Sequence, residues 1–264
     1  MHETMYAKGK EDLVNIKWNA DGYTRQFSFV HQYGEGVLDL IDAPVGSFVV
    51  DLGCGNGALT EKLQTRGYEV LGLDASSDMT DLAKKLHPEL PFQTADALQF
   101  SLDKPADVIF SNAVFHWIDK ENQTVLAANL ARNLKMGGSL VCEFGGKGCG
   151  EKVHQGLARN FEKRGLSYVM PFYFPTIGEY APILEKSGFR VEYALLFGRP
   201  TKQQGEDGLK GWIEMFVKEP FEGIEESVKE EIIRETVEDL REELHQDGSW
   251  YVDYVRIRIK AVKK

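Results

Sequence analysis

Three aspartates and a glycine-rich turn occupy the first half of the chain at positions that could bind a polar ligand. Asp51 comes just before the turn Gly53-Cys-Gly-Asn-Gly57, Asp74 lies 19 residues after Gly55, and Asp96 follows further along. Glycines let the backbone approach a ligand closely, and the start of a following helix offers unpaired N–H groups. Carboxylates accept hydrogen bonds from hydroxyl and amino groups. The pattern predicts a site for a ligand that carries such groups.

Two ligands fit the turn. Gly53-x-Gly-x-x-Ala58, with an acidic residue about 20 positions later, satisfies a relaxed dinucleotide fingerprint. Asp51 would face a pyrophosphate unfavourably, but it could bond ordered water near the cationic amino acid moiety of S-adenosylmethionine (SAM). Asp74 could accept both ribose hydroxyls, and Asp96 the adenine amino group with the Ala97 N–H beside the ring. These features favour SAM, and an NAD-dependent oxidoreductase stays as an alternative.

The elements that must position these residues alternate along the chain. Apolar runs predict strands at 48–52, 69–73, 92–95, 107–111, 139–144, 189–197 and 250–262. Helical spacing predicts helices at 23–41, 58–64, 77–86, 122–134, 151–164, 176–186, 209–217 and 223–245. Short connections over 48–145 are typical of a parallel sheet with helices on both faces. We therefore expect an α/β, Rossmann-like, doubly wound and mostly parallel seven-stranded sheet with a helical cap, and a ligand at the carboxyl ends of the strands.

The predicted elements divide the chain into four parts. Residues 1–45 form an N-terminal helical segment, 46–200 the core, 201–247 a helical cap insertion, and 248–264 the terminal strand of the core sheet. In the last strand apolar residues alternate with Arg256, Arg258 and Lys260, which predicts one buried face and one wet face.

Charge and composition narrow the classes of function. The net charge is −10, and residues 206–247 hold 15 acidic and 5 basic side chains, so nucleic acid is not an expected partner. Apolar runs are too short for a membrane span, and the polar N-terminus predicts no signal peptide. Three cysteines without zinc spacing predict a reducing, cytoplasmic compartment, no disulfide framework and no metal. The oligomeric state stays open.

These motifs resemble those of a known family. Asp51-Leu-Gly-Cys-Gly-Asn-Gly57, Asp74 and Ala95-Asp-Ala97 resemble successive motifs of class I SAM-dependent methyltransferases. Three more segments are similar to the trans-aconitate methyltransferase group of type 11 methyltransferases, so that the likeness covers about residues 17–260: Lys17-Trp-Asn-Ala-x-x-Tyr23, Ser111-Asn-Ala-Val-Phe-His-Trp117 and Trp212…Pro220-Phe221.

The resemblance implies SAM as the cofactor and S-adenosyl-L-homocysteine as its product, with the N-terminal segment folded over it. Aromatic rings there would face the sulfonium, because a cation is attracted to a ring face. The expected cofactor-binding residues are Tyr23, Phe29, His31, Asp51, Gly53, Cys54, Gly55, Asp74, Ala75, Met79, Asp96, Ala97, Ser111, Asn112 and Ala113.

On the acceptor side, Asn112-Ala-Val-Phe115 departs from the Asp/Asn-Pro-Pro-aromatic motif of nucleic-acid amino-methyltransferases. His116 is a candidate general base, or it hydrogen-bonds only cofactor or backbone. Trp117 and Trp212 are expected to wall a substrate pocket, which Phe172, Tyr173 or Phe216 could extend. Five cations in the less regular half could face a carboxylate: Arg159, Arg164, Arg190, Arg199 and Lys202.

Together these features predict a SAM-dependent methyltransferase that acts on a small-molecule acceptor, with a carboxylate among the candidates, by in-line methyl transfer. A SAM-binding module or sensor without transfer activity is the alternative.

Overall fold

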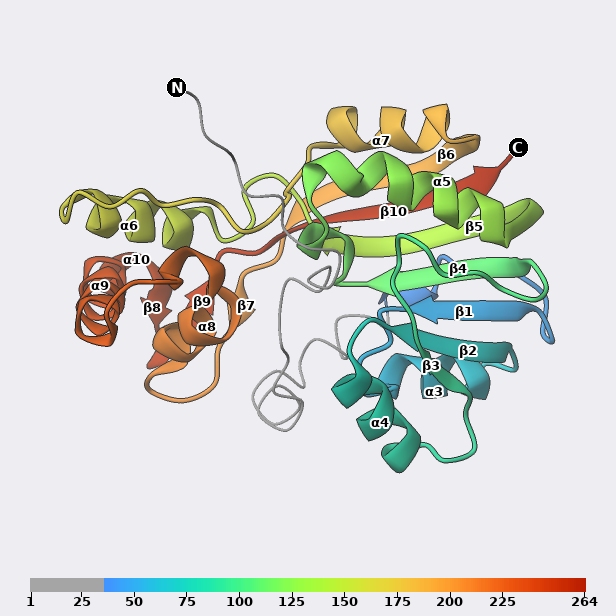
Figure 1. Cartoon of the computed structure of the whole chain (residues 1–264), viewed down its shortest axis with the longest axis horizontal. Coiled ribbons are helices and arrows are strands. Elements are labelled where there is room, and N and C mark those ends of the chain that lie inside the picture. The colour runs from blue at the N-terminus through green and yellow to red at the C-terminus, as the bar shows by residue number, and fades with distance from the viewer. Residues whose placement is uncertain (1–35) are drawn as a thin grey trace, which may run out of the picture.

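A computed structural model describes residues 36–264 of the 264-residue chain. The expected cofactor contacts Tyr23, Phe29 and His31 lie outside the described residues. A large sheet with its helices stands beside a smaller, mainly helical unit, and the chain passes between the two several times (Figure 1).

The large sheet has seven strands in the order β3-β2-β1-β4-β5-β10-β6. Its strands are β1 (Phe48–Leu52), β2 (Glu69–Asp74), β3 (Phe92–Thr94), β4 (Ala106–Asn112), β5 (Leu134–Gly145), β6 (Phe189–Gly198) and β10 (Val255–Lys263). The first five run parallel, and β10 is antiparallel to both of its neighbours. The order reverses between β1 and β4, which is the switch point of a doubly wound fold. The predicted fold class is confirmed.

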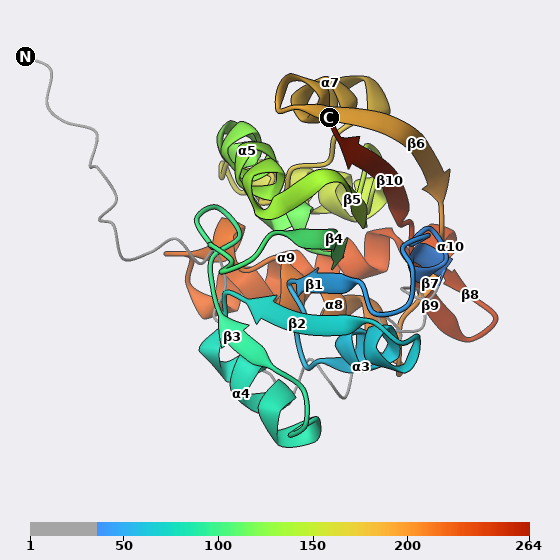
Figure 2. The same ribbon diagram turned by 90° about the vertical axis from the view of Figure 1, so that its right-hand side faces the viewer.

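Helices cover both faces of this sheet, as the end-on view shows (Figure 2). One face carries α3 (Ala58–Thr65) and α4 (Ser77–Leu86), and the other carries α5 (Gln123–Asn133) and α7 (Ile177–Lys186). Side chains of successive strand residues point to opposite faces, so Val49 packs with α3 while Val50 packs with α5. Helix α7 begins at the predicted capping box, in which Thr176 and Glu179 bond reciprocally.

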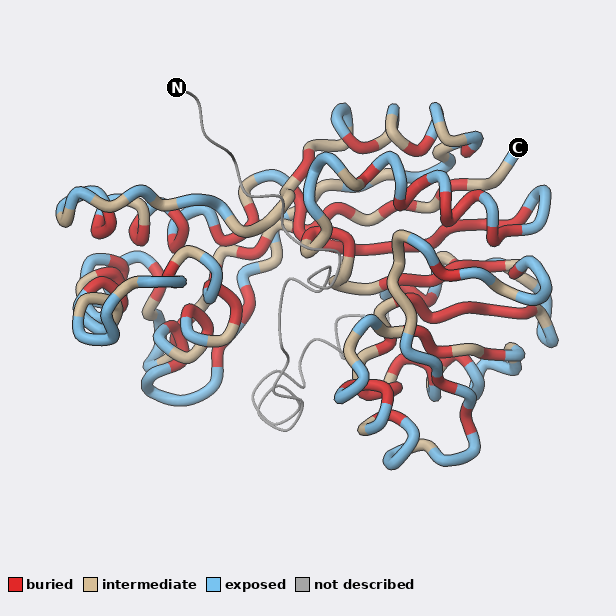
Figure 3. Tube along the Cα trace, in the orientation of Figure 1, coloured by how far each residue is buried: buried red, intermediate tan, exposed pale blue. Residues whose placement is uncertain are grey.

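The smaller unit, called the cap below, comprises residues 149–174 and 199–254. Its elements are α6 (Glu151–Glu162), β7 (Thr201–Lys202), α8 (Gly208–Phe216), α9 (Glu226–Asp239), α10 (Arg241–Leu244), β8 (His245–Gln246) and β9 (Ser249–Val252). The 3₁₀ turns are η1 (Phe115–Trp117) and η2 (Lys120–Asn122) in the core and η3 (Glu219–Phe221) in the cap. The cap has an apolar cluster of its own, and buried segments run through both units (Figure 3).

Helix α6 lies in the cap, although the sequence-based division counts it with the core. Its apolar residues, among them Val153 and Phe161, are buried in the cap cluster. Gly156 lets α9 come close, because a Cβ at this position would lie 3.1 Å from Thr236 of α9. Arg164, just after α6, adds two hydrogen bonds to Glu235, of 2.9 and 3.1 Å.

The predicted strand 250–262 is two strands in the structure. β9 pairs with β7 and β8 in the cap, and β10 belongs to the large sheet. Between them, the Asp253 carboxylate accepts the Lys152 N–H at 3.0 Å, and its carbonyl accepts the Gly150 N–H. The alternating pattern continues across this break, so the sequence does not mark it. The predicted helix 223–245 is likewise divided into α9 and α10.

No helix within residues 36–264 is both long and apolar enough to span a bilayer.

Candidate functional site

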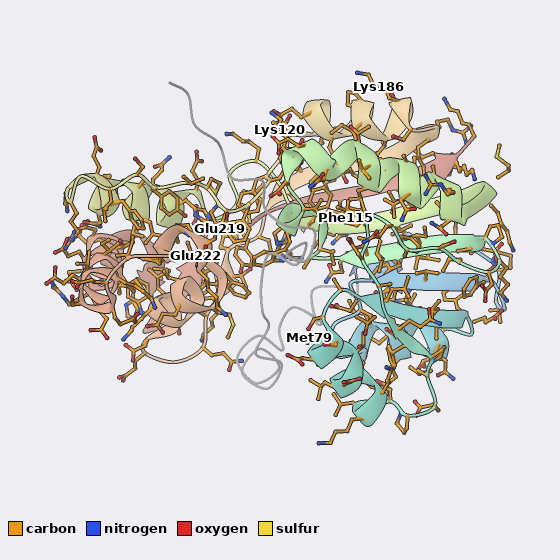
Figure 4. The ribbon with its side chains drawn as sticks, viewed as in Figure 1. Met79, Phe115, Lys120, Lys186, Glu219 and Glu222 are labelled. Carbon is orange, nitrogen blue, oxygen red and sulfur yellow. The ribbon has the colours of Figure 1, made fainter. Side chains whose placement is uncertain are left out.

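A cavity of about 210 Å³ lies between the carboxyl ends of the parallel strands and the cap. Twelve of the residues expected from the sequence line it: Gly53, Gly55, Asp74, Ala75, Met79, Asp96, Ala97, Asn112, Ala113, His116, Trp117 and Trp212. The structure thus brings together loops that follow four different strands. Met79 is placed at the end of α4 that faces the cap (Figure 4).

The glycine-rich turn gives the pocket an open stretch of backbone. Gly53 and Gly55 have φ angles of +77° and +54°, which favour glycine. A Cβ on Gly53 would lie 2.1 Å from Val114 Cγ2, so this glycine serves packing. Apart from Gly55 and its two chain neighbours, no atom of residues 36–264 comes within 4 Å of the Cβ position at Gly55. Gly55 is therefore where a ligand can approach the backbone.

Asp74 is held at the pocket by the backbone. Its Oδ2 accepts the Gly55 N–H and its Oδ1 accepts the Ser76 N–H, both at 2.9 Å. Burial raises the pKa of this carboxyl, and the two N–H groups act against the rise. One carboxylate thus orients the glycine turn and still lines the cavity.

The segments that follow β3 and β4 supply further residues of the core side of the pocket. Asp96 accepts the Leu98 N–H at 2.9 Å, which holds the turn after β3. Ala113, after β4, has a φ of +63°, a conformation uncommon for a residue other than glycine. Its N–H donates to the Glu143 carbonyl of β5 at 2.7 Å, which fixes this strained turn at the pocket.

Three expected residues do not line the cavity. Asp51 is buried under α3, where its Oδ2 accepts the Thr60 hydroxyl at 2.7 Å. Burial raises the pKa of Asp51 to about 7, and the Asp74 charge adds to this. Cys54 packs in the core between the sheet and α3, and Ser111 donates to the Leu52 carbonyl. These three side chains support the loops without lining the cavity.

Aromatic rings form the cap side of the cavity. Phe172 stacks on Phe174 with ring centroids 5.2 Å apart, and its centroid lies 4.7 Å from that of Trp117. Trp212 donates its indole N–H to the Tyr254 hydroxyl, so that neither polar group is left unpaired. Phe172 and Phe216 line the pocket as the sequence allowed, whereas Tyr173 does not. Such a wall suits an apolar part of a ligand.

His116 lies at the junction of the two sides. Its ring is buried, and its Nδ1 accepts the Gly145 N–H of β5 at 3.3 Å. Burial, followed by the positive charge of Arg256, holds the pKa of His116 well below its usual value. The ring is therefore neutral near pH 7.

Arg256 is the pocket residue that contradicts the sequence-based expectation. The alternating pattern placed it on the wet face of the last strand, but it is 6% exposed and lines the cavity. Its guanidinium carbon lies 4.4 Å from the centre of the Tyr254 ring. Its Nε is buried and has no hydrogen-bond partner among residues 36–264. The cap covers this face of β10, and no local pattern in the sequence signals such cover.

Arg164, Arg190, Arg199 and Arg258 have carboxylate partners. Buried Glu143 binds Arg199 at 2.8 Å and Arg258 at 2.7 Å. Arg164 and Arg190, also considered from the sequence, pair with Glu235 and Glu192. These contacts set Arg256 apart as a cation that faces the cavity.

Comparison with known proteins shows the family to which the chain belongs. Residues 49–138, which contain the glycine turn and all three aspartates, match the family model described as a methyltransferase domain. Over 259 residues the chain is 30% identical to an uncharacterized methyltransferase of Schizosaccharomyces pombe, covering 94% of this chain and 98% of that protein. The chain is a class I SAM-dependent methyltransferase. The resemblance found in the sequence is confirmed, and the oxidoreductase alternative is set aside.

Other relatives of this methyltransferase cover less of it or share only its fold. A trans-aconitate 2-methyltransferase of Methylobacterium nodulans is 40% identical over 129 residues, which is 48% of this chain and 49% of that protein. A putative methyltransferase of Bacillus halodurans superposes with a TM-score of 0.61 at 15% identity, over 86% of this chain and 97% of the other. Geranyl diphosphate C-methyltransferase of Streptomyces coelicolor, solved with S-adenosyl-L-homocysteine, has a TM-score of 0.53 at 17% identity, over 88% and 79%.

SAM is the cofactor of this methyltransferase, and the cavity suits it. The open backbone at Gly55 leaves room for a ligand, and the Asp74 carboxylate stands beside it. In such a complex SAM supplies an activated methyl group. The residues of the core side would hold it by hydrogen bonds, and the cap would exclude water.

Proposed function

We propose that this methyltransferase transfers the SAM methyl group to a small-molecule carboxylate that has an apolar body. The observation that carries the proposal is Arg256, a buried cation that lines the pocket and has no carboxylate partner within residues 36–264. An unpaired buried charge costs stability, so its place in a pocket suggests that a ligand pairs with it. Guanidinium binds a carboxylate through two parallel hydrogen bonds.

The lining of the cavity extends beyond the core-side residues that fit the cofactor. It continues from the strand ends at Asp74 and Asp96 to the cap rings of Phe172 and Trp212. A module that only bound SAM would need no such extension. The aromatic wall matches an apolar acceptor body, and Arg256 matches its charged end. The trans-aconitate 2-methyltransferase among the relatives is named for a small carboxylate, which supports the charged end of the proposed acceptor but not its apolar body.

The reaction would be an in-line displacement at the methyl carbon. A carboxylate oxygen attacks that carbon, the O–C bond forms as the S–C bond breaks, and the electron pair of the broken bond stays on sulfur. The products are a methyl ester and a thioether. What the protein contributes is alignment of the oxygen with the S–C axis and a dry site.

A methyl-transfer assay with small mono-, di- and tricarboxylates, beginning with trans-aconitate, tests the proposal. Neutral alcohols and amines of similar size serve as comparison acceptors. We expect methyl esters from the carboxylates. The KM for the carboxylate should rise at least tenfold in Arg256→Met, as expected when one partner of a buried charge pair is removed. The KM for SAM should stay unchanged.

Arg190→Met removes an arginine that is paired with Glu192 on the surface, and it is the matched control. It should leave both KM values unchanged. Preference for a neutral acceptor, or an Arg256→Met variant with the wild-type KM for the carboxylate, would contradict the proposal.

A further inference from the structure

The hydrogen bond at His116 determines which ring nitrogen carries the proton. The Gly145 N–H can only donate, so Nδ1 must present its lone pair to it. The proton of the neutral ring is then on Nε2. Gly145 of β5 is held in the sheet by its pairing with Arg256 of β10. It also packs closely against Phe174, since a Cβ on Gly145 would lie 2.3 Å from the Phe174 ring.

The groups around the ring keep it neutral. The rings of Trp117, Phe172 and Phe174 have centroids 5.3, 6.0 and 5.8 Å from that of His116. Arg256 on β10 adds a positive charge, which opposes protonation. Cys149 and Tyr254 line the same pocket from the cap, and burial raises the pKa of each, so both are uncharged near pH 7. A neutral ring with its proton on Nε2 can donate a hydrogen bond but has no free lone pair.

The carboxylates of the pocket already accept hydrogen bonds from backbone N–H groups. Asp74 accepts the N–H groups of Gly55 and Ser76, and Asp96 accepts that of Leu98. Both lie on the core side, among the residues that fit the cofactor. Among the described residues, the acceptor side therefore presents hydrogen-bond donors and no carboxylate, and these donors include the guanidinium of Arg256 and the Nε2–H of His116.

We infer that His116 donates a hydrogen bond to the acceptor carboxylate and does not act as a general base, so that this pocket methylates an oxygen that arrives already ionised. This inference rests on the proposed carboxylate acceptor. In the transfer step the electron pair of the attacking oxygen forms the new O–C bond, and the pair of the S–C bond goes to sulfur. No proton leaves the acceptor, so no base is required. This role replaces the general base considered from the sequence.

Nuclear magnetic resonance of the full-length protein with ¹⁵N-labelled histidine tests the tautomer. S-adenosyl-L-homocysteine is added, and the His116 signals are assigned by their loss in His116→Gln. We expect Nε2 protonated and Nδ1 unprotonated from pH 6 to pH 8. A proton on Nδ1, or titration of the ring near pH 6.5, would overturn the inference. This result does not depend on any acceptor.

A pair of variants then separates a donor from a base. His116→Gln keeps an N–H donor, and His116→Phe removes it while keeping a ring, with thermal unfolding as the check on folding. For trans-aconitate we expect the KM to rise roughly tenfold in His116→Phe. In His116→Gln it should change by less than about threefold. The kcat of wild type and of His116→Gln should show the same pH profile between pH 6.5 and 8.5.

A general base would give the opposite pattern. The kcat of His116→Gln would fall by roughly a hundredfold or more, and the wild-type kcat would rise with pH through an ionisation that the variant lacks. That outcome overturns the inference. If wild type neither binds nor methylates trans-aconitate or the other carboxylates, the proposed function fails, and the resonance experiment still reports the state of His116 separately.

Discussion

The core side and the cap side of the pocket differ in how their residues are brought together. On the core side, Asp74 and Asp96 follow successive strands, and each is held by N–H groups at most 19 residues away. On the cap side, Trp212 and Tyr254 bond across 42 residues, and Arg256 lies opposite Gly145. Shorter-range contacts therefore hold the carboxylates of the core side, where we expect the cofactor, whereas long-range packing forms the cap side, where we propose the acceptor. Changes in each should affect one ligand and spare the other.

The two units also bury titratable groups of opposite kind. In the core, burial raises the pKa of Asp51 to about 7, so the folded state favours its protonated form. In the cap, burial lowers the pKa of His154 to about 4, so the folded state favours its neutral form. His154 bonds Tyr168 through Nδ1 at 2.6 Å and lies in the cap interior. Their effects on stability must oppose each other.

The largest expected effect is on the pH dependence of the unfolding free energy. Urea unfolding of the cofactor-free protein at several pH values measures it. Because the folded pKa of His154 is below the unfolded value, the unfolding free energy should decrease as pH falls from about 6.5 to about 4. The folded pKa of Asp51 is above the unfolded value, so its contribution should decrease as pH rises from about 4 to about 7. Each contribution is about 3 to 4 kcal/mol.

The variants His154→Asn and Asp51→Asn remove one contribution each. Relative to wild type, His154→Asn should become more stable as pH falls, and Asp51→Asn should become more stable as pH rises. Groups that do not interact with the replaced residue cancel in these differences. If the unfolding free energies of both variants, relative to wild type, change in the same direction with pH, the predicted contrast between core and cap is wrong.

Next in size is a contrast between two glycines of the same turn. Gly53→Ala places a methyl group 2.1 Å from Val114 Cγ2 at a positive φ, so the unfolding free energy should fall by about 3 kcal/mol. Gly55→Ala meets no described atom within 4 Å, so its cost should be about 1 kcal/mol. Its methyl group enters the pocket, and the Kd for SAM should rise roughly tenfold. Denaturation measures the unfolding free energy of both variants, and calorimetric titration measures their Kd for SAM. Equal losses of stability in the two variants would contradict the different roles of the two glycines.

Asp74→Ala should reduce SAM binding by about 1 to 3 kcal/mol, because it removes a charged hydrogen-bond acceptor at the pocket. Asp81→Ala on the surface of α4 is the control, since its side chain is 76% exposed. Calorimetric titration with SAM measures the difference. Unchanged SAM affinity in Asp74→Ala would remove the ribose role expected for this residue.

The smallest expected effect concerns Arg256. Arg256→Met should raise the unfolding free energy by about 1 kcal/mol, because a buried charge without a carboxylate partner among the described residues gives way to an apolar side chain. SAM affinity should not change. Gain of stability with loss of acceptor binding is typical of a residue retained for function. A loss of stability greater than about 1 kcal/mol would instead show a structural role, as for a paired arginine.

Much of the core follows from local patterns. The apolar runs at 48–52 and 69–73 predicted β1 and β2 nearly to the residue, and the pair Thr176 and Glu179 predicted the start of α7. The glycine turn and the three aspartates were together enough to indicate SAM. These features can be predicted because each depends on residues close in sequence, where torsional preferences, periodicity and capping act.

The cap and the direction of single side chains were decided by tertiary packing. Asp51 and Ser111 lie in strands beside the pocket, but their side chains are held by Thr60 and by the Leu52 carbonyl. Arg256 continues an alternating strand pattern, but the cap covers it. Turns and helices arise from interactions within a few residues, so the sequence alone indicated most of the core side of the pocket. The cap side exists only when segments a hundred residues apart pack together, and burial then makes His116 neutral and places Arg256, expected on a solvent-exposed face, in the lining of the pocket.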